Sequence, residues 1–324
     1  MRYLVTGCAG FIGSHLSEHL LKDGHDVLGV DSFTDYYPRS YKDRNLDPIR
    51  SEPGFTLLEG DLANLPLERL LQGVDTVFHQ AAQAGVRASW GSQFSVYTQL
   101  NVLATQQLLE ACRHCTTLRR FVYASSSSVY GNAQTLPVSE DVTPQPVSPY
   151  GVTKLAGEHL SLLYHTNFGL PTVALRYFTV YGARQRPDMA FHRFIHAAFA
   201  GEPITVHEDG RQTRDCTHVS DVINANVLAG VRDAAIGHVY NIAGGSRVTV
   251  RHVLSVLEGV IGRKFRISYA SAQAGDVRDT YADISAAERD LAYAPKTSIE
   301  VGLRDEVDWY KDLVLPGLYS APRG

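Results

Sequence analysis

Residues 2–13 are Arg2-Tyr3-Leu4-Val5-Thr6-Gly7-Cys8-Ala9-Gly10-Phe11-Ile12-Gly13, and the expected fold follows first from this segment. Arg2 to Thr6 form an apolar run typical of a short buried strand, and Ser14 to Leu21 have a helical pattern. The glycines between them allow the backbone to approach a pyrophosphate closely, and the start of a helix offers it unpaired N–H groups. The segment therefore predicts a strand, a glycine loop and a helix that bind a dinucleotide.

An acidic residue ends the next apolar run, Val27 to Val30; this residue is Asp31. A carboxylate at this place can accept hydrogen bonds from both hydroxyls of the adenosine ribose and would repel a 2′-phosphate. The sequence therefore predicts NAD rather than NADP as the cofactor.

Other cofactor contacts are expected where later strands end. Asp61 follows the strand Phe55 to Glu59 and could accept from the adenine amino group, although a solvated turn is an alternative interpretation. The strand Asp75 to His79 leads into the small residues Ala81 and Ala82, which leave room for a cofactor at the carboxyl edge of the sheet. The polar segment 32–54 is expected to be irregular and to cover the adenosine end.

Composition limits the function classes. With 44% hydrophobic residues the chain can build a substantial core, and its net charge of −4 gives no basic field for nucleic acid. No apolar run approaches membrane-spanning length and no signal peptide precedes the first strand, so we expect a cytoplasmic protein. The scattered cysteines are expected to be free thiols rather than metal ligands: Cys8, Cys112, Cys115 and Cys216.

Strands alternate with helices as far as Phe178, and this alternation indicates a doubly wound parallel sheet. The pattern changes after Gly182. We predict an NAD-binding domain over residues 1–181, to which a later strand near 238–242 returns, and a smaller α/β substrate domain over most of 182–324. Arginines recur in the second part, and their guanidinium groups match diphosphate or carboxylate oxygens: Arg184, Arg186, Arg193, Arg211, Arg214 and Arg278.

The candidate catalytic residues lie between Ser125 and Lys154. Pro149 suits the first turn of a helix, so Tyr150 and Lys154, four residues apart, share one face of it. An ammonium beside a phenol lowers the phenol pKa toward the range of a general base, and Ser126 can share the same substrate proton. Tyr-x-x-x-Lys alone is a weak signal, but with the dinucleotide segment it predicts oxidation of an alcohol.

Together these motifs resemble the extended short-chain dehydrogenase/reductase superfamily, specifically the NAD-dependent epimerase/dehydratase family, and most closely its UDP-glucuronate 4-epimerases. The finer match lies in residues 85–90, 178–182 and 184–190. The resemblance implies tightly bound NAD, regenerated in each turnover, in contact with Gly7, Gly10, Phe11, Ile12, Gly13, Asp31, Asp61, Leu62, Ala81, Ala82, Tyr150, Lys154 and Tyr177. It implies a UDP-sugar in contact with Arg87, Ser126, Ser127, Ser128, Tyr150, Thr179, Arg186, Arg193, Arg214 and Arg278.

Related activities can be separated by residue type. Dehydratases of the superfamily have an Asp-Glu pair where Ser127 and Ser128 stand, and decarboxylases have a glutamate at the second of these positions. Neutral-sugar 4-epimerases usually have asparagine where Thr179 lies, so the resemblance assigns C6 carboxylate recognition to the two serines, Thr179 and Arg186. A UDP-glucose or UDP-N-acetylhexosamine 4-epimerase is the alternative, and a catalytically silent NAD-binding regulator is a more distant one.

The resemblance also implies a mechanism without net redox change. Tyr150 would take the proton of the 4-hydroxyl, Lys154 would bind the nicotinamide ribose and lower the Tyr150 pKa, and Ser126 would orient the hydroxyl. The helix from Gln93 to Cys112 and the one that begins at Pro149 are apolar over wide arcs, so a homodimer is expected. No nucleic-acid or membrane partner and no metal are expected.

Overall fold

The computed structural model of this protein describes residues 1–245 and 247–315 of the 324-residue chain. Its centre is a seven-stranded sheet in the order β11-β6-β5-β4-β1-β2-β3, and each neighbouring pair is parallel. The doubly wound parallel sheet predicted from the alternation is confirmed. The strands are β1 (Arg2–Thr6), β2 (Asp26–Asp31), β3 (Phe55–Glu59), β4 (Thr76–His79), β5 (Arg120–Ser126), β6 (Thr172–Tyr177) and β11 (Val239–Ile242).

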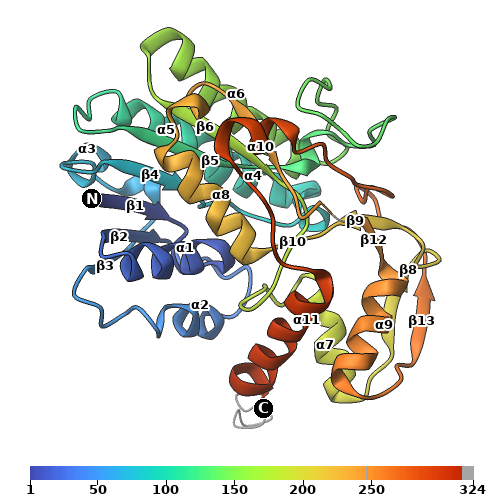
Figure 1. The fold of residues 1–324 in the computed structure, drawn as a ribbon. Coiled ribbons are helices and arrows are strands. Elements are labelled where there is room, and N and C mark those ends of the chain that lie inside the picture. The colour runs from blue at the N-terminus through green and yellow to red at the C-terminus, as the bar shows by residue number, and fades with distance from the viewer. Residues whose placement is uncertain (246, 316–324) are drawn as a thin grey trace.

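Helices cover both faces of this sheet (Figure 1). α1 (Phe11–Lys22) and α8 (Val219–Val231) pack with strand residues such as Val5. α5 (Ala104–Cys112) and α6 (Pro149–Phe168) cover the other face, where they pack with strand residues such as Leu4, the neighbour of Val5 in β1. Because successive strand residues point to opposite faces, each buried strand supplies both apolar layers.

The helix that carries Tyr150 and Lys154 has well-defined ends. The Ser148 hydroxyl accepts a hydrogen bond from the Gly151 N–H at 3.1 Å, and Pro149 is the first helical residue. At the other end Gly169 adopts the left-handed conformation, with φ 69°. Tyr150 therefore lies in the first turn of α6, with Lys154 one turn later.

Helix α1 begins at Phe11, three residues before the predicted start at Ser14. Gly10 is the N-cap, in extended conformation, so the last residues of the glycine loop are already helical. The first turn of α1, with its free N–H groups, therefore begins nearer to the start of the glycine loop than the sequence pattern predicted.

The prediction that residues 32–54 are irregular is wrong, because they contain α2 (Arg39–Leu46). Two of its three buried side chains are polar, beside Leu46: the Lys42 ammonium donates to the Thr34 carbonyl at 2.8 Å, and the Asn45 amide donates to the Ala9 carbonyl at 3.0 Å. A helix held in this way has no apolar periodicity for a sequence pattern to detect.

The predicted helix from Gln93 to Cys112 is present in three helical pieces. These are α4 (Phe94–Tyr97), the π-helix η4 (Thr98–Leu103) and α5. The buried Asn101 exchanges hydrogen bonds with the backbone of Gln83, at 2.7 and 3.0 Å, which anchors the π-helical turn beside the loop after β4.

Much of the chain after Gly182 forms a smaller body beside the sheet, at the lower right of Figure 1, whereas α8 and β11 return to the sheet. The apolar core of this body is formed by α7 (Ala190–Ala200), α9 (Val250–Ile261), α11 (Ile299–Trp309) and the short strands beside them. Within the described residues, none of the helices is long and apolar enough to span a membrane. Residues 246 and 316–324, part of the predicted second domain, lie outside the described residues. The remaining elements are α3 (Leu67–Leu70), β7 (Val180–Tyr181), β8 (Ile204–His207), β9 (Thr213–Asp215), β10 (Thr217–His218), β12 (Arg247–Thr249), β13 (Ile267–Ala270) and α10 (Ser285–Leu291).

A buried ion pair joins α6 to the sheet. Arg176 on β6 donates to both oxygens of Glu158, at 3.0 and 2.6 Å, and the Ser125 hydroxyl donates to the same carboxylate at 2.6 Å. The side chains of Arg176 and Glu158 are 5% and 1% exposed. Because Ser125 lies at the carboxyl end of β5, this pair supports the strand end that faces Tyr150.

The substitution Glu158→Gln should lower the free energy of unfolding by about 3–5 kcal/mol, because it leaves the Arg176 charge buried without its counterion. Urea unfolding measures the loss. The matched control is Glu59→Gln, since Glu59 forms a similar two-point pair with Arg39, at 2.6 and 2.7 Å, on the surface. The control should change stability little. If both variants lost the same free energy of unfolding, burial would not explain the contribution of the Glu158–Arg176 pair to stability.

Candidate active site

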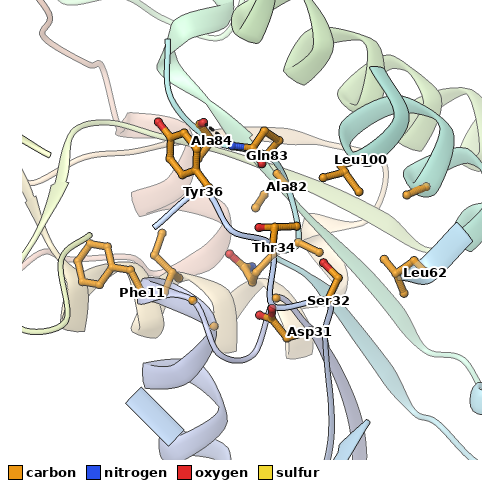
Figure 2. Close-up of a pocket in the computed structure, with 18 of the residues that line it drawn as sticks. Phe11, Asp31, Ser32, Thr34, Tyr36, Leu62, Ala82, Gln83, Ala84 and Leu100 are labelled. Atoms are coloured by element: carbon orange, nitrogen blue, oxygen red, sulfur yellow. Dashed lines mark hydrogen bonds between the residues drawn. The ribbon is translucent and has the colours of Figure 1, made fainter. Parts of the chain in front are cut away.

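A cleft that is partly open to solvent lies along the carboxyl edge of the sheet (Figure 2). Its walls follow the ends of β1 to β6, the place where open α/β sheets bind their ligands. The cleft brings together all the residues predicted to contact the cofactor: Gly7, Gly10, Phe11, Ile12, Gly13, Asp31, Asp61, Leu62, Ala81, Ala82, Tyr150, Lys154 and Tyr177.

The glycine loop packs closely against its neighbours. Gly7 has φ 71°, and a Cβ at this position would lie 2.8 Å from the Ala81 nitrogen. A Cβ at Gly13 would overlap the carbonyl oxygen of Gly7. Only glycine fits at both positions, so the loop lies tightly against the start of α1, and the first-turn N–H groups of a helix can bind an anion. This arrangement fits a pyrophosphate.

Asp31 is held in place at the end of β2. Its carboxylate accepts from the backbone N–H groups of Ala9 and Phe33, at 3.0 and 2.8 Å, and the Lys42 ammonium lies 3.9 Å away. Burial raises the pKa of Asp31, and Lys42 opposes this shift. Lys42 also lines the cleft and was missed in the sequence, because it belongs to the unrecognised helix α2.

Tyr150 and Lys154 line the same cleft, as predicted from their spacing. The Lys154 ammonium donates to the Ala124 carbonyl at 2.6 Å, and burial lowers its pKa to about 7. Burial raises the pKa of Tyr150, and the groups that oppose this shift are the Arg186 guanidinium and a hydrogen bond with Ser126. The Arg186 guanidinium thus favours the phenolate form of Tyr150 against the effect of burial.

The histidine at the end of β4 has no exposed ring nitrogen. His79 bonds to the Thr6 hydroxyl at 2.7 Å and to the Thr105 hydroxyl at 2.9 Å, and burial lowers its pKa to about 3. The neutral ring supports the floor of the cleft from inside the sheet. This agrees with a packing role rather than acid–base work.

The predicted C6 contacts lie around the end of β5 and the segment after β6. Ser126, Ser127 and Ser128 are half-buried, and the Ser128 N–H donates to the Ser126 hydroxyl at 3.2 Å. Thr179 is also half-buried. Of the arginines, Arg186 lines the cleft together with Tyr150.

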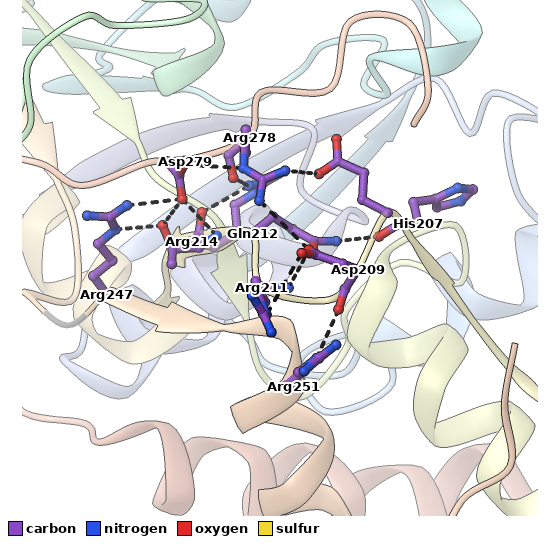
Figure 3. Close-up of polar contacts among 11 residues, drawn as sticks. His207, Asp209, Arg211, Gln212, Arg214, Arg247, Arg251, Arg278 and Asp279 are labelled. Carbon is purple, nitrogen blue, oxygen red and sulfur yellow. Dashed lines mark hydrogen bonds and ion pairs between the residues drawn. The ribbon is translucent and has the colours of Figure 1, made fainter. Parts of the chain in front are cut away.

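The other predicted substrate arginines are not among the residues that line the cleft. Figure 3 shows the polar contacts of two of them, Arg214 and Arg278. Arg278 pairs with Glu208 at 2.9 Å, and Arg214 donates to the Arg278 carbonyl at 2.7 Å. Arg87 reaches Asp276 at 2.7 Å, and Arg193 is exposed on α7. These guanidinium groups, apart from Arg193, are engaged by the protein itself.

Several cleft residues had no recognisable sequence signal. Tyr36 comes from the segment expected to cover the adenosine end, but its hydroxyl donates to Asp188 at 3.4 Å, beside Arg186. Figure 2 shows Tyr36 next to Ala84 and Gln83, at the end of the cleft opposite Asp31. Lining residues that were not among the predicted contacts include Ser32, Thr34, Tyr36, Lys42, Gln80, Gln83, Ala84 and Leu100.

Comparison with known proteins gives a consistent result. The model of the NAD dependent epimerase/dehydratase family matches residues 3–243. An uncharacterized UDP-glucose epimerase of Bacillus subtilis is 47% identical, over 97% of this chain and 99% of its own length. A UDP-glucuronate 4-epimerase of Thermodesulfobacterium geofontis is 38% identical, over 96% of each chain. The crystal structure of UDP-glucuronic acid 4-epimerase from Bacillus cereus, in complex with UDP-glucuronic acid and NAD, has a TM-score of 0.93 and 46% identity, and the match covers 97% of this chain and 100% of that one.

Proposed function

Because this chain belongs to the NAD-dependent epimerase/dehydratase family, we propose that it converts UDP-glucuronate to UDP-galacturonate by 4-epimerisation, without loss of CO₂. The observation that carries the proposal is one cleft that joins a dinucleotide cradle to Tyr150 and Arg186. A general base and a carboxylate-binding cation at the same end of the cleft suit a sugar acid.

The residues present fit NAD. The glycine loop and the first turn of α1 would hold the pyrophosphate, Asp31 would accept from the adenosine ribose, and Lys154 would hold the nicotinamide ribose. Bound NAD supplies a hydride acceptor and donor for the sugar C4. Residues 1–181 and the returning strand β11 would form this cofactor half, and residues 182–324 would mainly hold the UDP-sugar.

The protein's own residues move the proton. Tyr150, as phenolate, takes the proton of the 4-hydroxyl as the hydride leaves C4, and Ser126 orients that hydroxyl. The 4-keto sugar turns about its bonds to the diphosphate, and C4 receives the hydride on its opposite face. Tyr150 then returns the proton to O4, so the reaction has no net redox change.

The sugar acid requires a defined carboxylate site. Ser127, Ser128, Thr179 and Arg186 would surround the C6 carboxylate with donors. Each donor to a charged group contributes about 1.5–3 kcal/mol, so this set can distinguish a carboxylate from a hydroxymethyl group. Ser127 and Ser128 also replace the acidic pair that a dehydratase needs to eliminate water.

UDP-glucose is the second candidate substrate, and the name of the Bacillus subtilis relative favours it. A hydroxymethyl group needs no cation, so the presence of Arg186 in the cleft argues for the acid. The diphosphate is common to both substrates. Arg87, Arg193, Arg214 and Arg278 would bind it, and Arg87 and Arg278 would exchange their present partners Asp276 and Glu208 for phosphate oxygens.

The test is to incubate the purified protein with UDP-glucuronate or with UDP-glucose, without added cofactor, and to separate the products by anion-exchange chromatography. Formation of UDP-galacturonate without CO₂ is expected. Turnover of UDP-glucose alone would instead support the second candidate, and UDP-pentose products would contradict protection of the carboxyl group. No reaction even with added NAD would favour the silent regulator.

We also propose that the enzyme is a cytoplasmic homodimer. Four free thiols suit a reducing compartment. Apolar side chains on the adjacent helices η4 and α6 are exposed, including Leu103 at 45%, Val152 at 47% and Leu163 at 54%. Such a face, spread over two packed helices, is typical of an interface between subunits.

The double substitution Val152→Glu, Leu163→Glu should convert the dimer to a monomer, because each dimer would bury four unpaired carboxylates. Light scattering measures the mass in solution. The matched control is Val301→Glu, Leu313→Glu, a valine and a leucine that are 53% and 49% exposed in the C-terminal part. The control should remain dimeric. If both variants kept the mass of the unsubstituted protein, α6 would not be the interface.

A further inference from the structure

The loop after β7 contains a paired arginine and aspartate, and the arginine lines the cleft together with Tyr150. The Arg186 Nε and Nη2 atoms donate to the two oxygens of Asp188, each at 2.9 Å. The side chains are 20% and 32% exposed, so this pair is partly shielded from solvent. Two parallel hydrogen bonds fix both the position and the plane of the guanidinium.

A second contact to Asp188 comes from the segment after β2. The Tyr36 hydroxyl donates to Asp188 Oδ2 at 3.4 Å. Tyr36 itself is fixed against the loop after β4, because a Cβ at Gly85 would overlap its hydroxyl oxygen. The Tyr97 hydroxyl donates to the Gly85 carbonyl at 2.8 Å, and the Tyr97 ring meets the Tyr150 ring edge to face, with centroids 6.3 Å apart. Asp188 is therefore linked through packed groups to the proposed base.

The pairing leaves Arg186 with donors to spare. A guanidinium has more N–H groups than one carboxylate can accept, so the edge that does not meet Asp188 remains available to a ligand. Arg186 is also the cation that lowers the pKa of Tyr150 against the effect of burial. The negative charge of Asp188 offsets the positive charge of Arg186. The pair therefore favours an anion chiefly because the remaining N–H groups of Arg186 point in a fixed direction.

We propose that Asp188 is a positioning residue that aims Arg186 at the C6 carboxylate of a UDP-hexuronate and thereby sets both the preference for the acid and the retention of its carboxyl group. This inference rests on the proposed function. It adds a residue that was not among the expected substrate contacts, and it assigns the selectivity to orientation rather than to net charge.

Orientation matters because the 4-keto intermediate is a β-keto acid. When the C5–C6 bond aligns with the carbonyl π system, that bond breaks, its electron pair forms the enolate of the C4 ketone, CO₂ leaves, and C5 later takes a proton. A carboxylate held by a fixed guanidinium keeps the bond out of this alignment. A loosely held Arg186 would not.

The test compares Asp188→Asn with a matched control, Asp290→Asn. Asp290 accepts two hydrogen bonds from Arg289, at 2.8 and 2.9 Å, and one from the Tyr240 hydroxyl at 3.2 Å, but it lies outside the cleft. Three quantities are measured: kcat/KM for UDP-glucuronate and for UDP-glucose, and the fraction of UDP-glucuronate turnover released as CO₂. The thermal midpoint of each variant reports on folding.

Asp188→Asn should reduce the ratio of kcat/KM for UDP-glucuronate to that for UDP-glucose by about tenfold, the effect of one lost charged hydrogen bond. It should also release CO₂, while Asp290→Asn matches the unsubstituted protein in both respects. Asp188→Glu, which keeps the charge, should restore part of the ratio; this variant also provides the comparison if Asp188→Asn does not fold.

Three results would overturn the inference in distinguishable ways. If the unsubstituted protein prefers UDP-glucuronate and Asp188→Asn keeps that preference without releasing CO₂, Asp188 does not position Arg186 and the proposed function stands. If the unsubstituted protein does not act on UDP-glucuronate, the proposed function fails and the inference fails with it. A parallel loss on both substrates with a lower thermal midpoint would show a structural role only.

Discussion

Tyr150→Phe should lower kcat for UDP-glucuronate by about 100- to 10,000-fold, the usual contribution of a positioned general base. The phenyl ring keeps the packing against Tyr97 but cannot take the proton of the 4-hydroxyl. NAD should remain bound, because the glycine loop and Asp31 lie on other elements. Turnover is measured by product chromatography, and retained cofactor by its absorbance after the protein is denatured.

The matched control for this prediction is Tyr164→Phe. Tyr164 lies on the same helix α6, and its hydroxyl donates to Glu110 at 2.6 Å, away from the cleft. The control should keep turnover close to that of the unsubstituted protein. Undiminished activity of Tyr150→Phe would remove Tyr150 from the mechanism, and loss of bound NAD would assign it a role in cofactor binding.

Arg186→Ala should lower kcat/KM for UDP-glucuronate by about 10- to 100-fold more than for UDP-glucose, because only the acid loses a charged hydrogen bond. Arg289→Ala is the matched control, since Arg289 forms the same two-point pair with Asp290 outside the cleft. It should leave the ratio unchanged. Equal losses on both substrates would rule out carboxylate recognition by Arg186.

The same variant should also change the pH dependence. Burial raises the pKa of Tyr150, and Arg186 is the charge that opposes this shift. Without Arg186 the Tyr150 pKa rises further, so less phenolate is present at a given pH. The increase of kcat/KM with pH should therefore move to higher pH on both substrates. An unmoved profile would mean that Arg186 does not act on Tyr150.

Much of the cofactor half of the site could be predicted from the sequence. Gly7, Asp31 and Ala81 each lie at or just after the end of an apolar strand, and parallel strands bring their carboxyl ends to one edge. The Tyr150–Lys154 spacing is equally local, because one helix that starts at Pro149 directs both side chains to the cleft. Short-range patterns were sufficient for these residues.

Other features depended on contacts between distant segments. Helix α2 has no apolar periodicity, because two of its three buried side chains are polar and are held by hydrogen bonds to Thr34 and Ala9. The positive charge beside Tyr150 was expected from Lys154, one helical turn away. In the structure the Lys154 ammonium is buried and donates to the Ala124 carbonyl.

The sequence alone was thus enough for the sheet, the dinucleotide cradle and the base on α6, since each follows from residues adjacent along the chain. Arg186 was expected at the substrate from the family resemblance, but its pairing with Asp188 and the contact of Tyr36 with Asp188 were not accessible in this way. Asp188 and Tyr36 are 152 residues apart in the chain and meet only when the second part folds against the sheet. Their geometry and electrostatics arise from burial and long-range packing, which no local pattern encodes.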